Sequence, residues 1–327
     1  MSSPARYLDL GPGPSAATLV VGSGRSGTTW VGNVIAKMTR ARPIFEPLLL
    51  DEHLELALAT ERQFKPDWLQ SGRLLYIEPN LGPESRHHAR IEAILSGRVR
   101  SVWTDRGLSC APYFRRVIKE IRANLLLPYI CRHWPGVRVI WIVRNPVAVV
   151  SSQMIMALRY GWTFDKELEV VADGRMDRWL SEALMALRSA RTLASKLAHR
   201  WCIETMLPLK AGIHQLPTVE LVSYENLASD STAWRPISRL VAGTEWSGDG
   251  FQQLLRRPSP TSRVLVERHL RSNPGCEEPS ADDMREVERV VHGYGLTGLL
   301  DPNSVEATFS TITPGAATGT QREARAG

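Results

Sequence analysis

The stretch Val21-Gly22-Ser23-Gly24-Arg25-Ser26-Gly27-Thr28-Thr29-Trp30 decides how the chain folds. It begins at the end of a short β-branched segment, 18–22, which is expected to be a strand. It runs into 28–39, where apolar residues recur at helical spacing. A glycine turn between a buried strand and a helix points several backbone N–H groups at one place, with the positive end of the helix dipole behind them. The stretch therefore predicts a nest for a phosphate-like anion, to which Arg25 adds a permanent charge.

Strands and helices alternate on both sides of this stretch, which is typical of a parallel sheet with helices on both faces. The sequence predicts an α/β fold with a central sheet of about five strands in one domain, 18–302. A flexible arm at 1–17 and a disordered tail at 303–327 are expected to flank it. The remaining strands are expected at 43–46, 116–122, 137–143 and 218–224. The further helices are expected at 51–63, 125–133, 146–159, 176–209 and 281–294, with an irregular insertion at 65–86.

The composition is that of an ordinary globular protein, with 43% hydrophobic and 23% charged residues. A net charge of +6 favours an anionic partner, but the basic residues form no long run, so nucleic acid is not the expected partner. No apolar run reaches the roughly 18 residues of a membrane span. Four widely spaced cysteines and the absence of a secretory signal favour a cytoplasmic location. The cysteines are Cys110, Cys131, Cys202 and Cys276.

The sequence differs from that of nucleotide hydrolases at two informative positions, one in the loop and one after a later strand. Gly22 and Gly27 have the hydrolase spacing, but Thr28 stands where that pattern demands a lysine. The strand at 137–143 ends in Arg144, where a magnesium-binding aspartate is expected in such enzymes. The site is therefore expected to bind a nucleotide without a metal ion.

Gly24 to Trp30 resembles the 5′-phosphosulfate loop of sulfotransferases that use 3′-phosphoadenosine 5′-phosphosulfate (PAPS). The resemblance implies a P-loop-NTPase-like sulfotransferase fold. The motif sequences are most similar to those of carbohydrate-type and bacterial members. It also implies that one continuous set of residues binds the donor and its product, 3′-phosphoadenosine 5′-phosphate (PAP). These residues are Arg25, Ser26, Gly27, Thr28, Thr29 and Trp30.

Two further segments resemble the same family. Arg144 and Ser152 have the spacing of its 3′-phosphate motif, with Ser151 as the alternative serine. Tyr224, in the text Val-Ser-Tyr-Glu-Asn-Leu, resembles a tyrosine that approaches the adenine, although a tyrosine packed at a sheet edge is the equal alternative. Arg263 is a candidate for binding the nucleotide from order along the chain alone.

The catalytic candidates follow two other strands. Glu46, in Phe-Glu-Pro-Leu, is the first choice for the base that deprotonates the acceptor; pairing with an arginine, or binding of the acceptor alone, are its alternatives. Lys119 is the candidate cation at the transferred group, and Arg122 is an additional anion-binding candidate. If 99–104 were the strand instead, Asp105 or Arg106 would replace Lys119.

The resemblance implies sulfuryl transfer from PAPS to an acceptor hydroxyl on a sugar, glycolipid or small-molecule alcohol. Two other functions stay open: a nucleotide kinase or NTPase, and a non-catalytic protein that binds adenine nucleotides. The expected partner is a small-molecule or glycan acceptor, and the sequence predicts no oligomeric state.

Overall fold

A computed structural model describes residues 8–49, 74–101, 103–105, 108, 112–160, 168–257, 278–301 and 308. Its centre is a sheet of five parallel strands in the order β3-β6-β2-β7-β9, so the strand that precedes the glycine loop lies in the middle. These strands are β2 (Ala17–Val21), β3 (Arg42–Phe45), β6 (Arg116–Glu120), β7 (Arg138–Val143) and β9 (Val219–Ser223). Two short parallel pairs lie outside it: β1 (Leu8–Asp9) with β5 (Pro112–Tyr113), and β4 (Leu74–Ile77) with β8 (Val170–Asp173).

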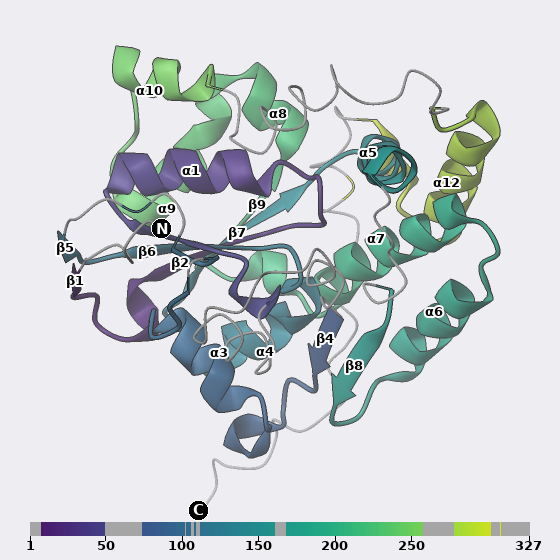
Figure 1. Ribbon diagram of the computed structural model, residues 1–327, viewed down its shortest axis with the longest axis horizontal. Helices are drawn as coiled ribbons and strands as arrows, with labels where there is room; N and C mark the ends of the chain where they lie inside the picture. The colour runs from purple at the N-terminus through teal and green to yellow at the C-terminus, as the bar shows by residue number, and fades with distance from the viewer. Residues whose placement is uncertain are drawn as a thin grey trace, which may run out of the picture.

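Helices cover both faces of the sheet (Figure 1). On one face the main helices are α1 (Thr28–Thr39), α9 (Arg235–Ala242) and α10 (Asp249–Leu255). On the other face they are α3 (His88–Leu95), α4 (Leu127–His133), α5 (Pro146–Tyr160), α7 (Leu193–Lys210) and α12 (Ala281–Gly293). Helix α6 (Arg178–Ser189) packs on α7, and the short α8 (Tyr224–Ser229) follows β9.

Alternating residues of the central strands explain why both faces are covered. Val20 and Ile140 pack with the α1 side, whereas Leu19 and Trp141 pack with the α5 and α7 side. A strand with both faces buried reads as a continuous apolar run, because successive side chains point to opposite faces. The predicted α/β fold with a central parallel sheet of about five strands is confirmed.

Several element boundaries differ from the sequence-based expectation. The helical region expected at 176–209 is two helices, α6 and α7, because Thr192 starts a new helix by accepting a hydrogen bond from the Ser195 N–H. The insertion expected to be irregular contains β4. The helix expected at 51–63 lies outside the described residues.

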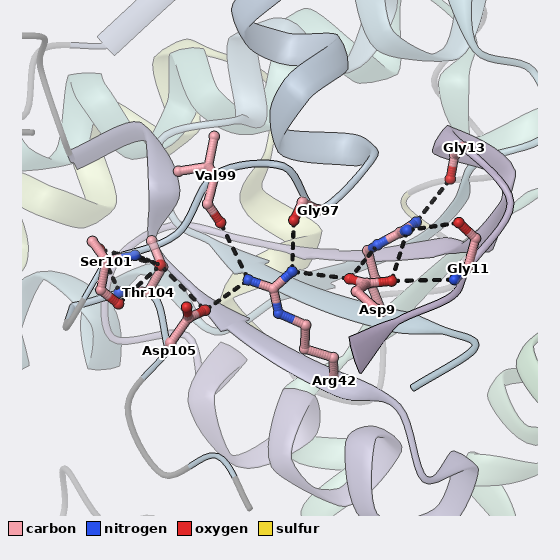
Figure 2. A network of polar contacts seen from close by, with 10 residues as sticks. Asp9, Gly11, Gly13, Arg42, Gly97, Val99, Ser101, Thr104 and Asp105 are labelled. Atoms are coloured by element: carbon pink, nitrogen blue, oxygen red, sulfur yellow. Dashed lines mark hydrogen bonds and ion pairs between the residues drawn. The ribbon is translucent and has the colours of Figure 1, made fainter. Parts of the chain in front are cut away.

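The described part of the N-terminal segment is attached to the sheet through Asp9 (Figure 2). Its carboxylate accepts hydrogen bonds from Arg42 Nη1 at 2.9 Å and Arg116 Nε at 2.8 Å. Arg116 also donates to the carbonyl oxygens of Gly11 and Gly13, each at 2.8 Å. Burial alone would raise the pKa of Asp9, but the hydrogen bonds from Arg116 and Arg42 outweigh it and lower that pKa. The limits of the arm, domain and tail stay a prediction.

Asp105 belongs to the same network. It accepts a hydrogen bond of 2.7 Å from Arg42 Nη2, at the start of β3. In the described parts of 99–105 there is no strand, and β6 is the strand that carries Lys119. Asp105 is thus paired at the amino end of β3, while Arg106 lies outside the described residues.

Among the described helices, none has the length and apolar composition to cross a membrane.

Candidate functional site

The carboxyl ends of the five parallel strands bring the predicted site residues to one edge of the sheet. In an open α/β sheet this edge binds ligands, and the crevice opens where the connections from two neighbouring strands run in opposite directions. Here the chain continues from β2 to β3 on one side and from β7 to β9 on the other. The order of the strands orders the residues along the edge. They are Glu46 after β3, Lys119 and Arg122 at the end of β6, the glycine loop after β2, Arg144 after β7 and Tyr224 after β9.

The glycine loop has the backbone geometry of an anion nest. Gly27 has φ +86° and caps α1, which begins at Thr28, so the first N–H groups of that helix lie beside the loop. Arg25 also has a positive φ, of 77°. The hydroxyl oxygen of Ser26 is buried and has no hydrogen-bond partner among the described residues. A buried polar atom without a partner costs stability unless a ligand supplies one, so the loop is suited to an oxyanion.

Arg25, Arg144 and Ser152 converge although they are far apart in sequence. Arg144 Nη1 donates to the carbonyl oxygen of Arg25 at 2.9 Å, and Arg25 Nε donates to the Ser152 hydroxyl at 3.0 Å. The residues predicted for the 5′- and 3′-phosphates therefore touch one another. Their binding roles stay a prediction.

Tyr224 lies between the glycine loop and Arg144. A Cβ on Gly27 would collide with the ring atoms Cδ2 and Cε2 of Tyr224, so the ring is packed directly on the glycine backbone. The guanidinium carbon of Arg144 lies 4.6 Å from the centre of the same ring, a cation–π contact. Trp30 meets the Tyr224 ring edge-on, with the ring centres 5.9 Å apart. Trp30 and Tyr224 thus support the loop from the β9 side.

Glu225 is a residue of this site that the sequence did not predict. Its Oε1 accepts a hydrogen bond of 3.1 Å from the Asn145 N–H and lies 4.0 Å from Arg144 Nε. Its Oε2 accepts a hydrogen bond of 3.1 Å from the Ser223 hydroxyl. Glu225 therefore joins the ends of β7 and β9 and fixes Arg144. Its position directly after Tyr224 is the feature of the sequence that could have indicated it.

Glu46, Lys119 and Arg122 form a buried ionic cluster at the other end of the edge. Glu46 Oε1 accepts from Lys119 Nζ, and Glu46 Oε2 accepts from Arg122 Nη1 at 3.1 Å. Burial alone would raise the pKa of Glu46, but the charges of Lys119 and Arg122 outweigh it and lower that pKa to about 2. Burial lowers the pKa of Lys119 more than the attraction of Glu46 raises it. Without a ligand, Glu46 is thus an ion-paired carboxylate and a weak base.

Glu120 also belongs to this ionic cluster, since one of its oxygens lies 3.8 Å from Arg122 Nη1. Its two oxygens accept from the N–H groups of Leu48 at 2.7 Å and Arg122 at 3.0 Å. Burial, the largest influence, raises the pKa of Glu120. Glu46 has a positive φ of 40°, where the chain turns after β3. The hydrogen bonds of Glu120 connect this turn to the end of β6. Both carboxylates and both cations are held as one unit.

One predicted residue is not described by the structure, and one residue of the site was not predicted. Arg263 lies outside the described residues. Gln153, next to Ser152 on α5, was not predicted, yet its Nε2 donates to the carbonyl oxygen of Gly24 at 2.8 Å. A side chain that binds loop backbone has no signature in sequence, because backbone atoms are the same at every residue.

Comparison with solved structures finds distant similarity, and a search of curated proteins finds no significant match. One similar structure is retinol dehydratase in a complex with retinol and PAP, at 14% identity and a TM-score of 0.42, covering 87% of this chain and 82% of that one. Another is mouse sulfotransferase SULT7A1 complexed with PAP, at 13% identity and a TM-score of 0.42, covering 92% and 91%. A third is a sulfotransferase from Alicyclobacillus acidocaldarius, at 12% identity and a TM-score of 0.35, covering 88% and 96%.

The comparison with family models gives a direct match. Residues 18–203 match the model described as "Sulfotransferase family". The match begins at β2 and includes the glycine loop, the ionic cluster of Glu46 and the Arg144 segment, and it spans more than half of the chain. The chain belongs to the sulfotransferase family.

Proposed function

We propose that this chain transfers a sulfuryl group from PAPS to a hydroxyl of a sugar, glycolipid or small-molecule alcohol. The hydrogen bond from Arg144 to the Arg25 carbonyl carries the proposal, because it joins two anion-binding segments in one site. A donor with anionic groups at both its 5′ and 3′ positions can satisfy both segments. A nucleotide with a 5′ anion alone would use only the loop.

In this proposal, the loop 22–27 and the start of α1 hold the 5′-phosphosulfate. The N–H groups at the helix start, the Ser26 hydroxyl and the Arg25 guanidinium are its donors. Arg144 and Ser152 hold the 3′-phosphate. The contact between two cationic segments at neighbouring strand ends supports a donor with two anionic groups.

The reaction forms a bond between sulfur and the acceptor oxygen and breaks the bond between sulfur and the bridging phosphate oxygen. The electron pair of the broken bond stays on PAP, and the acceptor proton goes to a base. By analogy with phosphoryl transfer, positioning and charge stabilisation contribute most of the rate. Lys119 is the proposed cation at the bridging oxygen, where negative charge grows.

Glu46 is the proposed base, and its ion pairs determine when it can act. With a pKa of about 2 it binds protons poorly while Lys119 and Arg122 are paired with it. An incoming anionic donor competes for both cations, and its own charge disfavours a second anion nearby. Both effects raise the pKa of Glu46, so the base becomes effective when the donor is bound.

The test is product analysis with the purified protein. PAPS, labelled in its sulfuryl group, is incubated with panels of sugar, glycolipid and alcohol acceptors, and sulfated product and PAP are measured together. Equal amounts of the two are expected with at least one acceptor class. Magnesium-dependent turnover of ATP without use of PAPS would instead favour a kinase or NTPase, and tight PAP binding with no product across the panels would favour a non-catalytic binding protein.

A further inference from the structure

The side chain of Ser23 connects the glycine loop to helix α7. Ser23 is the second residue after β2, and its hydroxyl donates to Oε2 of Glu204, in the middle of α7. Both residues are buried. The hydroxyl proton of Ser23 is engaged by the Glu204 carboxylate and is not available to an anion bound by the loop. Ser23 therefore attaches the loop to α7.

Glu204 is charge-balanced within its own helix. Its Oε1 accepts a hydrogen bond of 2.9 Å from Arg200 Nε, one turn earlier, and the two side chains are 1% and 2% exposed. A buried carboxylate below an anion-binding loop would repel the ligand, and Arg200 cancels that charge. A buried ion pair is rarely needed for packing, since apolar residues of similar volume serve as well. The hydrogen bond from Ser23 connects this ion pair to the glycine loop.

A second contact holds the next residue of the loop. Gln153, on α5, donates from Nε2 to the carbonyl oxygen of Gly24 at 2.8 Å. A nest binds an anion only when its N–H groups point inward and its carbonyl groups point away. Ser23 and Gly24 are thus held from the face of the sheet that α5 and α7 share.

We propose that Glu204 is a positioning residue for the anion loop, acting through Ser23, with Arg200 as its charge partner. The three residues fix the loop in its anion-binding conformation before the ligand arrives, which lowers the ordering cost of binding. Glu204 touches neither donor nor acceptor. The inference extends the proposed function, since it concerns how the same loop is formed.

The first test is Ser23→Ala, which removes the donor and leaves Glu204 balanced by Arg200. The affinities for PAP and for adenosine 5′-phosphate are expected to fall together by about tenfold, since both ligands place a phosphate on the loop. Turnover at saturating PAPS is expected to change less than KM for PAPS. The matched control is Thr192→Ala, which removes another hydroxyl-to-carboxylate bond of α7, the 2.6 Å contact to Glu286 at its exposed end. That control is expected to lower the melting temperature without changing either affinity.

A second test works even where Ser23→Ala folds poorly. The double variant Arg200→Met/Glu204→Leu removes the acceptor and both charges, and is expected to lose the same tenfold. Adding Ser23→Ala to it is expected to cause no further loss, because the contact is already gone. Arg200→Met/Glu204→Gln, whose amide oxygen still accepts from Ser23, is expected to bind PAP within about threefold of the unmodified protein. Additive losses from Ser23 and Glu204 contradict the inference.

Inorganic pyrophosphate separates this inference from the proposed function. It probes the anion loop alone, through the rise in melting temperature on saturation. If the unmodified protein is stabilised by pyrophosphate but not by PAP, the proposed donor is wrong and the role of Glu204 is judged on pyrophosphate. If Ser23→Ala responds to pyrophosphate as strongly as the unmodified protein, Glu204 does not position the loop.

Discussion

The guanidinium of Arg144 donates a hydrogen bond of 2.9 Å to the carbonyl oxygen of Arg25, across 119 residues of sequence. Through Arg25 the contact extends to the hydroxyl of Ser152. The glycine loop and the end of β7 therefore form one surface. Several measurable consequences arise from this coupling and from the ion pairs around it.

Arg144→Ala is expected to weaken PAP about 10- to 100-fold and adenosine 5′-phosphate much less, because a charge-assisted bond to the 3′-phosphate is lost. Isothermal titration with both ligands measures the ratio. Arg138, at the opposite end of the same strand, provides the matched control, and Arg138→Ala should leave both affinities unchanged. Equal weakening of the two ligands by Arg144→Ala would refute a role at the 3′-phosphate.

Tyr224 can support Arg144, contact adenine, or do both, and two substitutions separate these roles. Tyr224→Phe keeps the ring that packs on Gly27 and under Arg144, so it should leave the ratio of PAP to adenosine 5′-phosphate affinity unchanged. Tyr224→Leu removes the cation–π contact and should weaken PAP several-fold more than adenosine 5′-phosphate. Equal losses for both ligands would identify an adenine contact instead.

Glu46→Gln is expected to bind PAP at least as tightly as the unmodified protein, since Lys119 and Arg122 lose their competing anion. It is expected to lose most turnover, by about 100-fold or more, if Glu46 accepts the acceptor proton. Single-turnover sulfation measures the chemical step without product release. Circular dichroism of the same sample establishes that the variant is folded. Unchanged turnover would leave Glu46 as the residue that holds Lys119 and Arg122, and would turn attention to Glu120.

The ion pairs of Glu46 also predict how stability depends on pH. The folded pKa of about 2 lies below the ordinary value of 4.5, so the carboxylate stabilises the fold above pH 4.5 and this contribution disappears as pH falls towards 2. Urea unfolding of the native protein should therefore lose stability over that interval. Glu46→Gln should show a smaller decrease over the same interval; an identical decrease would mean that other carboxylates cause it.

Asp9→Asn is expected to destabilise the fold by about 3 kcal/mol, since it removes the charge that two buried arginines, Arg42 and Arg116, share. The lowered pKa of Asp9 means that its contribution is present above pH 4 and is lost as pH falls further. Asp282→Asn is the control, because Asp282 pairs with Arg285 on the exposed side of α12 and such a pair contributes little. Chemical denaturation that gives equal values for both variants would contradict the network's role.

The local pattern of the sequence predicted the frame of the site well. The helix 28–39 has the predicted bounds, because glycines and a β-branched run mark where strand, loop and helix meet. The strand with Lys119 was the first of two alternatives, and the helix that begins at Pro146 was also predicted. The start of α7 was missed, although Thr192 is a good N-cap residue, because the apolar pattern continues across it.

The partners of the charged side chains could not be predicted. Asp9 meets Arg42 and Arg116, and Ser23 meets Glu204, only because the fold brings distant segments together. Charge alone gives many equivalent pairings in a chain with 40 basic and 34 acidic residues. The pairing of Glu46 was anticipated as an alternative, yet its two cations depend on β3 lying beside β6.

The central position of β2 divides the work of the edge between two flanks. On the β7 and β9 flank lie Arg144 and Tyr224, which are proposed to select the donor, and on the β6 and β3 flank lie Lys119 and Glu46, which are proposed to perform the transfer. The glycine loop lies between the two flanks, at the end of the central strand. Under this proposal, substitutions beside Glu46 and Lys119 alter the transfer step while Arg144 and Tyr224 continue to recognise the same donor.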